Sequence, residues 1–396
     1  MPLKKLSSLE KEHLQGKKVL LRVDFNVPLK EGKVMDATRI KKTLPTINYL
    51  LKNGSSVIIM THIGRPKGRF VDDLSTAPIA TELSKMINRP VIEANDCIGA
   101  EVSKLKQELK QGEILMLENT RFHTAEKENT RDFSRELAEH CDLFIQDAFA
   151  SVHRGHASTV GVAHFLPSYA GLLVEREAEV LSEIMKNDEH PFVLVTGGAK
   201  IDTKIGVIRH FLKTADSILV GGGLANTFLY ASGFEVGASL CEKNKTDLAQ
   251  EILADSESMG GKLHIPIDTI VAKEISSNAD FNNKQNDLIM EDDIMLDIGV
   301  VTQDYFLECI KNAKVIVWNG PMGLFEHDIF AQGTKRIARA IADSDAMTVI
   351  GGGDTIEAIN RFNISEDSFT HVSTGGGAMI EFLEGKILPG LSVLKD

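Results

Sequence analysis

The chain has 396 residues, which is more than a single hydrophobic core usually organises, so its length favours two domains. Its 43% of hydrophobic and 25% of charged residues are typical of a globular protein and exclude a disordered or fibrous chain. The formal net charge of −12 argues against nucleic acid or an anionic membrane surface as the principal partner, although a local cluster of Arg and His can still bind a small anion.

The cysteines and the apolar segments indicate the kind of compartment. Cys97, Cys141, Cys241 and Cys309 form no C-x-x-C pair and lie far apart, so neither a zinc site nor a disulfide framework is expected. The N-terminal segment has no apolar stretch of signal-peptide length, and nowhere do eighteen apolar residues follow one another. We therefore expect a cytoplasmic protein without a membrane span.

Short apolar runs alternate with stretches of helical periodicity along the chain. In the first half, strands are predicted within residues 18–28, 56–66, 113–122 and 142–150, and helices at 77–87 and 130–140. In the second half, strands are predicted within residues 191–198, 217–223, 315–321 and 347–355. Because these strands are nearly continuous in Val, Ile and Leu, they indicate parallel sheets covered by helices on both faces.

The boundary between two domains is expected near residues 167–188, which read as one long amphipathic helix. The predicted fold is α/β, with two Rossmann-like parallel-sheet domains joined by this hinge helix. We place the N-terminal domain at 1–170, the linking helix at 171–189 and the C-terminal domain at 190–380. The tail, 381–396, combines a Gly/Pro turn with a short apolar, strand-like end, which favours docking over a dangling end.

Basic and polar side chains follow the predicted strands of the first half. In open parallel sheets, ligands bind beyond the carboxyl ends of the strands, so these positions are the informative ones. They hold Asp24, Asn26, Arg39, His62, Arg65, Arg121, His123, His153, Arg154 and His156. Arg forms forked, charge-assisted bonds with phosphate or carboxylate, so several Arg side chains in one crevice would suit a small polyanionic acid.

Each of these residues also has a simpler interpretation. A single Arg is usually a solvated surface group, and Asp24 and Asn26 could only cap a turn. A metal site at His153 and His156 stays open, but the fragment specifies no metal geometry, so an anionic partner or a structural role is favoured.

Glycine and lysine follow the strands of the second half. Lys200 and Lys204 lie four residues apart after a Gly pair, and we predict that both lie on one face of a helix, where lysine can balance the charge of a transferring phosphate. A solvated helix face is the alternative. Glycine triplets begin at Gly221, Gly351 and Gly375, where amides at a helix N-terminus can bind phosphate, although a tight turn explains a single triplet equally well.

Four further residues of this half have two interpretations each. Asp354 is an oxygen ligand placed where Mg²⁺ could bridge nucleotide phosphates, but it and Thr355 could also be helix caps. Glu326 could accept hydrogen bonds from ribose hydroxyls or be a solvated loop carboxylate. Trp318, the only tryptophan, is predicted to lie in the core and not to stack on a nucleotide.

Several nucleotide-binding signatures are missing from the sequence. It has no G-x-x-x-x-G-K-[ST] string, no G-x-G-x-x-G string with a downstream acidic partner, and no H-R-D or D-F-G string. A nucleotide site without a P-loop, together with a basic site for a small anion, indicates phosphoryl transfer between small molecules.

The sequence resembles the phosphoglycerate kinase family, from about Leu3 to the C-terminus, on nine strings that occur in order. They are RVDFNVP, THIGRP, ENTRFH, DAFASVHRGHAST, GGAKIDTKIGVI, GGGLANTFL, WNGPMGLFE, GGGDT and STGGGA. The resemblance implies reversible phosphoryl transfer from 1,3-bisphosphoglycerate to MgADP, giving 3-phosphoglycerate and MgATP in glycolysis. It also implies that the C-terminal tail folds back onto the N-terminal domain and that the protein is a monomer.

The resemblance assigns site residues to both halves. It implies an acid-substrate site in the N-terminal domain at Asp24, Phe25, Asn26, Arg39, His62, Ile63, Gly64, Arg65, Arg121, Arg154 and His156. It implies a nucleotide site in the C-terminal domain at Lys200, Lys204, Gly222, Asn319, Pro321, Gly323, Glu326, Gly352, Gly353, Asp354 and Thr355, with Mg²⁺ on Asp354. One departure is Gly155, since the family more commonly has alanine at this position. We expect the glycine to loosen the loop that holds Arg154.

The mechanism expected for such a site relies on position and charge. Because a metaphosphate-like transfer needs little covalent help, we assign Arg39 and Lys204 to the equatorial oxygens of the moving group, assisted by the amides of Gly375 and Gly376. Hinge closure would bring the two substrates together and expel water. The rival hypotheses are a non-catalytic nucleotide-binding regulatory protein on the same fold and a hydrolase of small phosphate esters.

Overall fold

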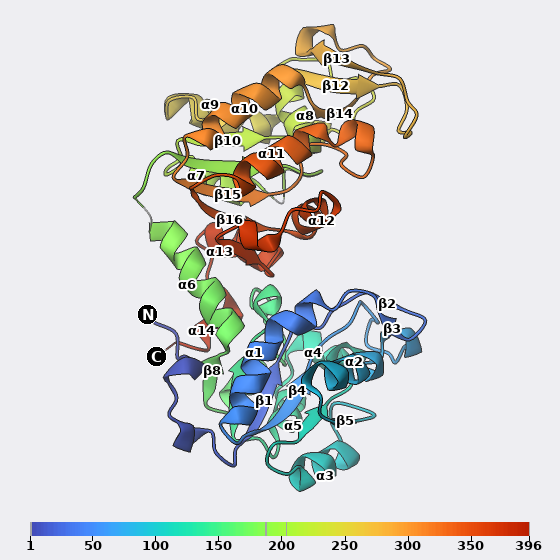
Figure 1. Ribbon diagram of the computed structural model, residues 1–396, viewed down its shortest axis with the longest axis vertical. Helices are drawn as coiled ribbons and strands as arrows, with labels where there is room; N and C mark the ends of the chain where they lie inside the picture. Colours follow the sequence, from blue (N-terminus) through green and yellow to red (C-terminus); the bar gives the residue numbers. More distant parts are fainter. Residues whose placement is uncertain (1, 187, 203, 396) are drawn as a thin grey trace. The chain divides into compact units, whose positions relative to one another are not determined.

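The computed structural model describes residues 2–186, 188–202 and 204–395 and divides into two compact units (Figure 1). Unit 1 comprises Met1–Leu181 and Lys386–Asp396, and unit 2 comprises Ser182–Gly385. Each unit is built on a parallel sheet, so the predicted fold class is confirmed. In the part of the chain described, no helix is both long and apolar enough to cross a membrane.

The sheet of unit 1 has six parallel strands in the order β5-β6-β4-β1-β7-β8. Their bounds are Lys18–Arg22 for β1, Ser56–Met60 for β4, Val91–Glu93 for β5, Ile114–Met116 for β6, Leu143–Gln146 for β7 and Ser168–Ala170 for β8. The central strands β1 and β4 are almost wholly buried, which is why their sequences are continuous apolar runs. A two-stranded hairpin, β2 at Leu29–Lys30 with β3 at Lys33–Val34, follows β1.

Helices cover both faces of the sheet of unit 1. Helices α1 (Thr38–Lys52) and α2 (Ala77–Ile87) pack on the face that carries Val19 and Leu21 of β1. Helices α3 (Ala100–Glu108) and α5 (Arg131–Ala138) pack on the opposite face, which carries Leu20. The alternation along β1 therefore divides the apolar core of unit 1 into two layers. The short helix α4 (Thr124–Glu128) precedes α5.

The C-terminal segment packs on unit 1. Helix α14 (Pro389–Ser392) is followed by a bridge between Leu3 and Lys395, and the amide of Gly390 donates to the carbonyl of Val152 at 2.7 Å. Leu388, Leu391 and Leu394 are buried. The expected return of the tail is confirmed, but the prediction of a strand-like end is wrong, because Pro389 opens a helical turn.

The sheet of unit 2 also has six parallel strands, in the order β11-β10-β9-β15-β16-β17. Their bounds are Phe192–Thr196 for β9, Ser217–Val220 for β10, Leu263–His264 for β11, Val315–Asn319 for β15, Met347–Gly351 for β16 and His371–Ser373 for β17. A separate antiparallel sheet has the order β13-β12-β14, with β12 at Asp268–Ala272, β13 at Phe281–Gln285 and β14 at Ile294–Ile298.

The helices of unit 2 enclose its parallel sheet. They are α7 (Ile205–Phe211), α8 (Gly222–Ala231), α9 (Thr246–Ser258), α10 (Val300–Lys311), α11 (Gln332–Ala342), α12 (Gly353–Arg361) and α13 (Gly377–Leu383). Residues of α10, α11 and α12 form one core cluster with the sheet, and this cluster includes the fully buried Trp318, as predicted. The ring of Phe192 contacts that of Phe211 of α7, with 5.0 Å between ring centroids.

The long helix expected at residues 167–188 is shorter at its start. Ser168–Ala170 form strand β8, and helix α6 runs from Leu172 to Lys186. The buried carboxylate of Asp147 accepts the amide of Leu173 at 2.9 Å, so a long-range contact sets the first turn of the helix. The division between the units falls within α6, and Asn187 of the predicted linking helix lies outside the described residues.

Candidate functional site

The polar residues of unit 1 lie at one edge of its sheet. Strands β6, β4, β1 and β7 are neighbours and parallel, so the segments that follow them meet at the same edge. These segments carry Asp24 and Asn26 after β1, His62 to Arg65 after β4, Arg121 after β6, and Arg154 and His156 after β7.

Asp24 and Asn26 connect neighbouring segments at this edge. The Asp24 carboxylate, which is buried, accepts from the guanidinium of Arg39 on α1. Asn26 Oδ1 accepts the amide of Gly64 at 2.8 Å, which joins the segments after β1 and β4. The Arg39 side chain stays 40% exposed in this ion pair, so it remains accessible to a ligand.

Arg121 is a buried cation at the same edge. Its Nη1 donates to the carbonyl of Gly64 at 2.7 Å, whereas its buried Nε has no hydrogen-bond partner among the described residues. Burial and the like charges of Arg154 and Arg22 lower its pKa to about 10, so it is still charged at neutral pH. An anion beside Arg121 would relieve this repulsion.

The histidines of the edge are held in the neutral state. Burial lowers the pKa of His62 well below its usual value, and neighbouring Arg side chains lower it further. Burial and three arginines, Arg121 first among them, lower the pKa of His156 to about 4. A neutral imidazole keeps one N–H donor, so the site offers hydrogen bonds as well as the charge of its Arg side chains.

The residues assigned to the acid site differ in how directly they can act. Phe25 and Ile63 are buried in the apolar core, so their backbone alone is available to a ligand. Arg65 is exposed on the loop after β4. A Cβ added at Gly155 would meet no atom within 4 Å, so the family's alanine would fit there, and the glycine relieves no crowding.

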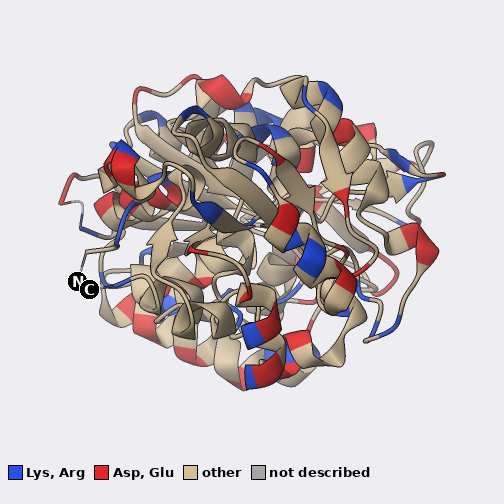
Figure 2. Ribbon diagram, turned by 90° about the horizontal axis from the view of Figure 1, so that it is seen from below, with Lys and Arg blue, Asp and Glu red and all other residues tan. Residues whose placement is uncertain are grey.

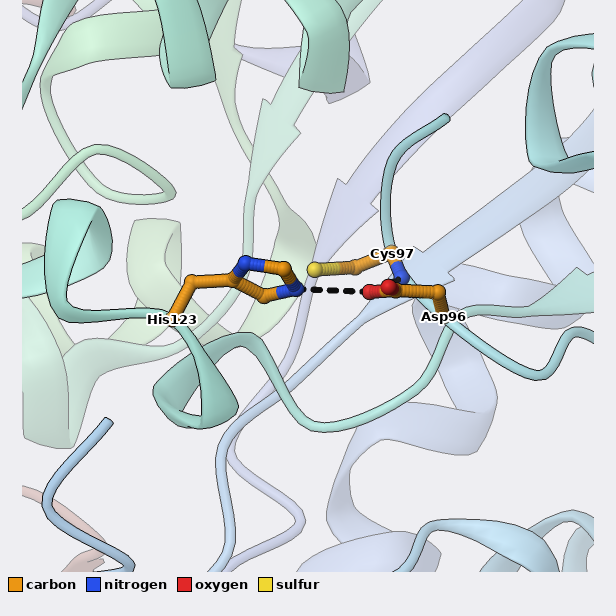
Figure 3. Close-up of side chains that lie close together, drawn as sticks. All are labelled: Asp96, Cys97 and His123. Atoms are coloured by element: carbon orange, nitrogen blue, oxygen red, sulfur yellow. Dashed lines mark hydrogen bonds and ion pairs between the residues drawn. The ribbon is translucent and has the colours of Figure 1, made fainter. Parts of the chain in front are cut away.

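Asp96, Cys97 and His123 lie together beside this edge, and Figure 3 shows their side chains pointing toward one another. His123 Nε2 and Asp96 Oδ1 are 2.7 Å apart, and the amide of Cys97 donates to the same carboxylate at 2.6 Å. The three could hold a metal ion, but burial raises the pKa of the Cys97 thiol well above its usual value, which disfavours a thiolate ligand. We interpret the group as an anchor for the loop that carries Arg121.

Unit 2 contains two adjoining cavities at the carboxyl ends of its strands. The first has a volume of about 520 Å³, the second about 350 Å³, and Gly198, Ala199 and Asp354 line both. The first is also lined by Gly222, Pro321, Gly323 and Glu326, and the second by Lys200, Lys204, Asn319, Gly352, Gly353, Thr355 and Gly376. The eleven residues assigned to the nucleotide therefore all line one of these two cavities.

Lys204 is the buried cation of the second cavity. Its ammonium donates to Asn319 Oδ1, and Asn319 Nδ2 donates to the carbonyl of Gly351 at 2.5 Å, which fixes the position of the amide. Burial lowers the pKa of Lys204 to about 8, although Asp354 opposes the shift. A phosphate in this cavity would favour the charged ammonium.

The prediction that Lys200 and Lys204 share a helix face is wrong. Helix α7 begins only at Ile205, with Lys204 as its N-cap, and Lys200 lies in the preceding loop. The loop is held by distant residues, because the amide of Ile201 donates to the carboxylate of Glu242 at 2.6 Å. Both lysines nevertheless line the same cavity.

The glycine-rich turns of unit 2 precede helices, as predicted. Gly222 and Gly352 have φ values of 64° and 104°, a region that favours glycine, and helices α8 and α12 begin at or directly after them. Gly376 is the N-cap of α13. The amide of Gly375 donates to Ser373 Oγ at 3.0 Å, so it is engaged within the protein.

Sequence reasoning missed four buried polar residues that support the two sites. Arg22, Asn119 and Glu126 lie in unit 1, and Asp297 lines the larger of the two adjoining cavities described above. Asn119 Oδ1 accepts the amides of Ile63 and Arg121, and Asp297 accepts that of Gly333 at 2.6 Å. Arg22, Asn119 and Asp297 interrupt or follow apolar strand sequences, which is the one signal that could have drawn attention to them.

Comparison with known proteins gives a consistent result for the whole chain. A sequence model described as phosphoglycerate kinase matches residues 9–386. Over 100% of both chains, the protein is 47% identical to the phosphoglycerate kinase of Dictyoglomus turgidum. It is 46% identical to that of Moorella thermoacetica, over 98% of this chain and 99% of the relative.

Solved structures of phosphoglycerate kinases have the same fold. The structure from Coxiella burnetii superposes with a TM-score of 0.88 at 40% identity and covers 99% of each chain. The structure from Pyrococcus horikoshii superposes with a TM-score of 0.85 at 34% identity, over 99% of this chain and 98% of that one.

Proposed function

The chain belongs to the phosphoglycerate kinase family, and we propose roles for its own residues in the reaction of that family. The reaction is the reversible transfer of a phosphoryl group between 1,3-bisphosphoglycerate and ADP, which gives 3-phosphoglycerate and ATP in glycolysis. The chain is thus a phosphotransferase whose acceptor is a carboxyl group.

The acid substrate binds at the basic edge of unit 1. The observation that carries this proposal is the group of cations at the ends of β4, β6 and β7, where Arg121 has a buried Nε without a protein partner among the described residues. Arg154 and Arg121 repel each other electrostatically in the protein alone, and a phosphate or carboxylate between them would turn this cost into binding. Asp24 and Asn26 position Arg39 and the Gly64 amide.

The nucleotide binds in the two cavities of unit 2. The larger, mostly apolar cavity suits the base and ribose, with Glu326 at its wall as an acceptor for ribose hydroxyls. The smaller cavity, with Lys204 and the glycine turns, suits the phosphates.

The donor set of unit 2 fits Mg²⁺ bound with a nucleotide. Asp354 is exposed and lines both cavities, so its carboxylate can reach an ion that also touches phosphate oxygens. Mg²⁺ is commonly held by one or two carboxylates together with substrate phosphates and water, and one carboxylate is what this site provides. When bound, the ion would neutralise phosphate charge.

Transfer then depends on charge and position. Arg39 and Lys204 stabilise the equatorial oxygens of the moving phosphoryl group, and the amide of Gly376 at the start of α13 assists. The Gly375 amide contributes only if it leaves Ser373 Oγ. Because the two half-sites belong to different units, transfer requires the units to close, which excludes water from the reactive acyl phosphate. We expect this to occur in a monomer in the cytoplasm.

A coupled assay with 3-phosphoglycerate and MgATP tests the function. We expect ATP consumption that depends on 3-phosphoglycerate. A parallel reaction without acceptor and without coupling enzymes, monitored for phosphate, separates the rivals. Phosphate release without acceptor would indicate a hydrolase, and nucleotide binding without turnover would indicate a regulatory protein.

A further inference from the structure

We propose that a buried chain of hydrogen bonds from Glu126 through Ser158 and Arg22 holds His62 with its proton on Nε2, so that this nitrogen donates to the acid substrate. The proposal rests on the proposed function only in placing the substrate beside His62. Arg22, Ser158 and Glu126 are positioning residues in this arrangement, because each acts through the next.

The direction of the hydrogen bonds is set by Arg22. A guanidinium has donors and no acceptor, so every partner of Arg22 must accept. Nη2 lies 2.8 Å from His62 Nδ1, so Nδ1 accepts and carries no proton. A neutral imidazole has one N–H group, which must therefore be Nε2–H.

The other end of Arg22 is fixed in the same way. Its Nε donates to Ser158 Oγ at 2.9 Å, so the Ser158 hydroxyl must direct its own hydrogen elsewhere. That hydrogen goes to Glu126 Oε1 at 2.6 Å, and the amide of Ser158 donates to Glu126 Oε2 at 2.9 Å. Arg22 thus donates in both directions, to His62 Nδ1 on one side and to Ser158 Oγ on the other, and the Ser158 hydroxyl passes its own hydrogen to the Glu126 carboxylate, which can only accept.

Burial makes this arrangement rigid. Glu126 and Ser158 have no exposed surface, and Arg22 is 1% exposed, so water cannot replace a lost partner. His62 keeps 5% of its surface exposed, and among the described residues its ring is hydrogen-bonded through Nδ1 and not through Nε2. The free nitrogen is therefore available to a ligand.

The surroundings explain why a neutral donor is useful here. The charged groups that face His62 are Arg22, Arg121 and Arg154, with His156 beside them, and each of them disfavours a second proton on the ring. A neutral Nε2–H group can bind phosphate or carboxylate without adding to this repulsion. The imidazole then needs no proton uptake when the substrate arrives.

The experiment is a ¹⁵N–¹H correlation spectrum of the imidazole groups in the full-length wild-type protein. His62 is identified by the signals that disappear in His62→Gln. We expect the Nε2–H pattern between pH 6 and 8, with and without 3-phosphoglycerate. A proton on Nδ1, or a charged ring at pH 7, would overturn the proposal, whether or not the protein shows kinase activity.

A matched pair of variants tests the chain of hydrogen bonds. Ser158→Ala removes the link between Arg22 and Glu126, so we expect a mixture of His62 tautomers and a rise of roughly threefold to tenfold in KM for 3-phosphoglycerate, with a smaller change in kcat. Thr159→Val is the control, because its buried Oγ1 has no hydrogen-bond partner among the described residues, and this variant should leave the tautomer and KM unchanged. If Ser158→Ala kept the wild-type imidazole spectrum and KM, the chain would not position His62. If this variant failed to fold, the wild-type spectrum alone would still decide the tautomer.

Discussion

Arg39 combines a fixed base with an accessible end, since the buried Asp24 carboxylate holds its guanidinium while 40% of its side chain stays exposed. We predict that Arg39→Ala lowers kcat by about 10²-fold or more, because the charge would act mainly in the transition state. Steady-state kinetics measures kcat, and a thermal unfolding curve shows separately whether the variant is still folded. Lys41→Ala, an exposed change on the same helix, is the control. Turnover near that of the wild type would show that Arg39 does not stabilise the phosphoryl group during transfer.

Lys204 should give the reaction an alkaline limit. Its pKa is lowered to about 8 by burial, so the free protein loses the ammonium charge as pH rises through that value. We predict that kcat/KM for the nucleotide falls above about pH 8. The decline in kcat should occur at higher pH, because bound phosphates raise the pKa again. A profile that is flat from pH 7 to 9.5 would contradict this role.

Asp354 should control the requirement for magnesium. We predict that Asp354→Ala raises the Mg²⁺ concentration needed for half-maximal activity, because the one carboxylate that lines both cavities is lost. The measurement is activity against Mg²⁺ at constant nucleotide. Glu357→Ala, an exposed residue of the same helix α12, should leave the curve unchanged. An unchanged curve for Asp354→Ala would show that Asp354 does not bind the ion; the alternative of a helix cap is already wrong, because Gly352 is the N-cap of α12.

At this scale the sequence predicted which side chains lie together better than it predicted their local conformation. Asp24, His62 and Arg121 follow apolar strands, and the parallel sheet brings such positions together whatever the loops do. The helix around Lys200 could not be predicted correctly, because the loop depends on Glu242, which lies 41 residues from Ile201. The same limit applies to Arg22, whose partners are spread over the fold.

Two helices of unit 1 are joined by a buried ammonium. Lys106 of α3 is 1% exposed, and its Nζ donates to the carbonyls of Glu136 and Leu137 in the last turn of α5, at 3.2 and 2.8 Å. It thereby donates to the Leu137 carbonyl near the end of the helix, and it adds a second donor to the Glu136 carbonyl, which also accepts the amide of Glu139 at 3.3 Å.

We predict that Lys106→Met lowers the free energy of unfolding by about 1–3 kcal/mol, because the methionine fills the space but removes the buried ammonium that donates to both carbonyls. Urea denaturation measures the change. Lys104→Met is the control on the same helix, where the lysine is exposed and forms only a surface ion pair with Glu108. If both variants were equally stable, the contact of Lys106 with α5 would contribute nothing.

Elements were predictable where the local pattern agreed with the final packing. Helix α2 matches the predicted 77–87, because its apolar face packs on the sheet and Pro78 sits in its first turn. The sheet of β12, β13 and β14 gave no such signal, since β13 is mostly exposed and reads as a polar segment. Strand β8 lies in a segment whose sequence reads as helical. The start of helix α6 after it is set by Asp147, a distant residue that the local sequence pattern does not include.

Charge is distributed over the molecule in a way that the net value of −12 does not reveal. Figure 2 shows Lys and Arg interspersed with Asp and Glu along the helices. The basic edge of unit 1, by contrast, groups its arginines closely enough that Arg154 lowers the pKa of Arg22, and Arg154 and Arg22 lower the pKa of Arg121, in addition to the larger effect of burial. An acidic protein can thus bind two strongly anionic substrates through local sites.

The two proposed half-sites belong to different units, and α6 carries residues of both units. We predict that the radius of gyration in solution scattering decreases when 3-phosphoglycerate and nucleotide are both present, and changes less with either alone. The physical reason is that both ligands must be bound before closing the units gains contacts on each side. Equal radii under all four conditions would contradict hinge closure.

The packing of residues 386–395 on unit 1 has a consequence for how the protein is made. The first 181 residues emerge from the ribosome long before Leu388, Leu391 and Leu394 are added, because the 204 residues of unit 2 are synthesised in between. Until these residues are made, the nascent N-terminal unit lacks the segment that packs on Val152. Unit 1 is therefore completed only after unit 2 has been synthesised, and a chain that stops after residue 385 lacks the segment that completes unit 1.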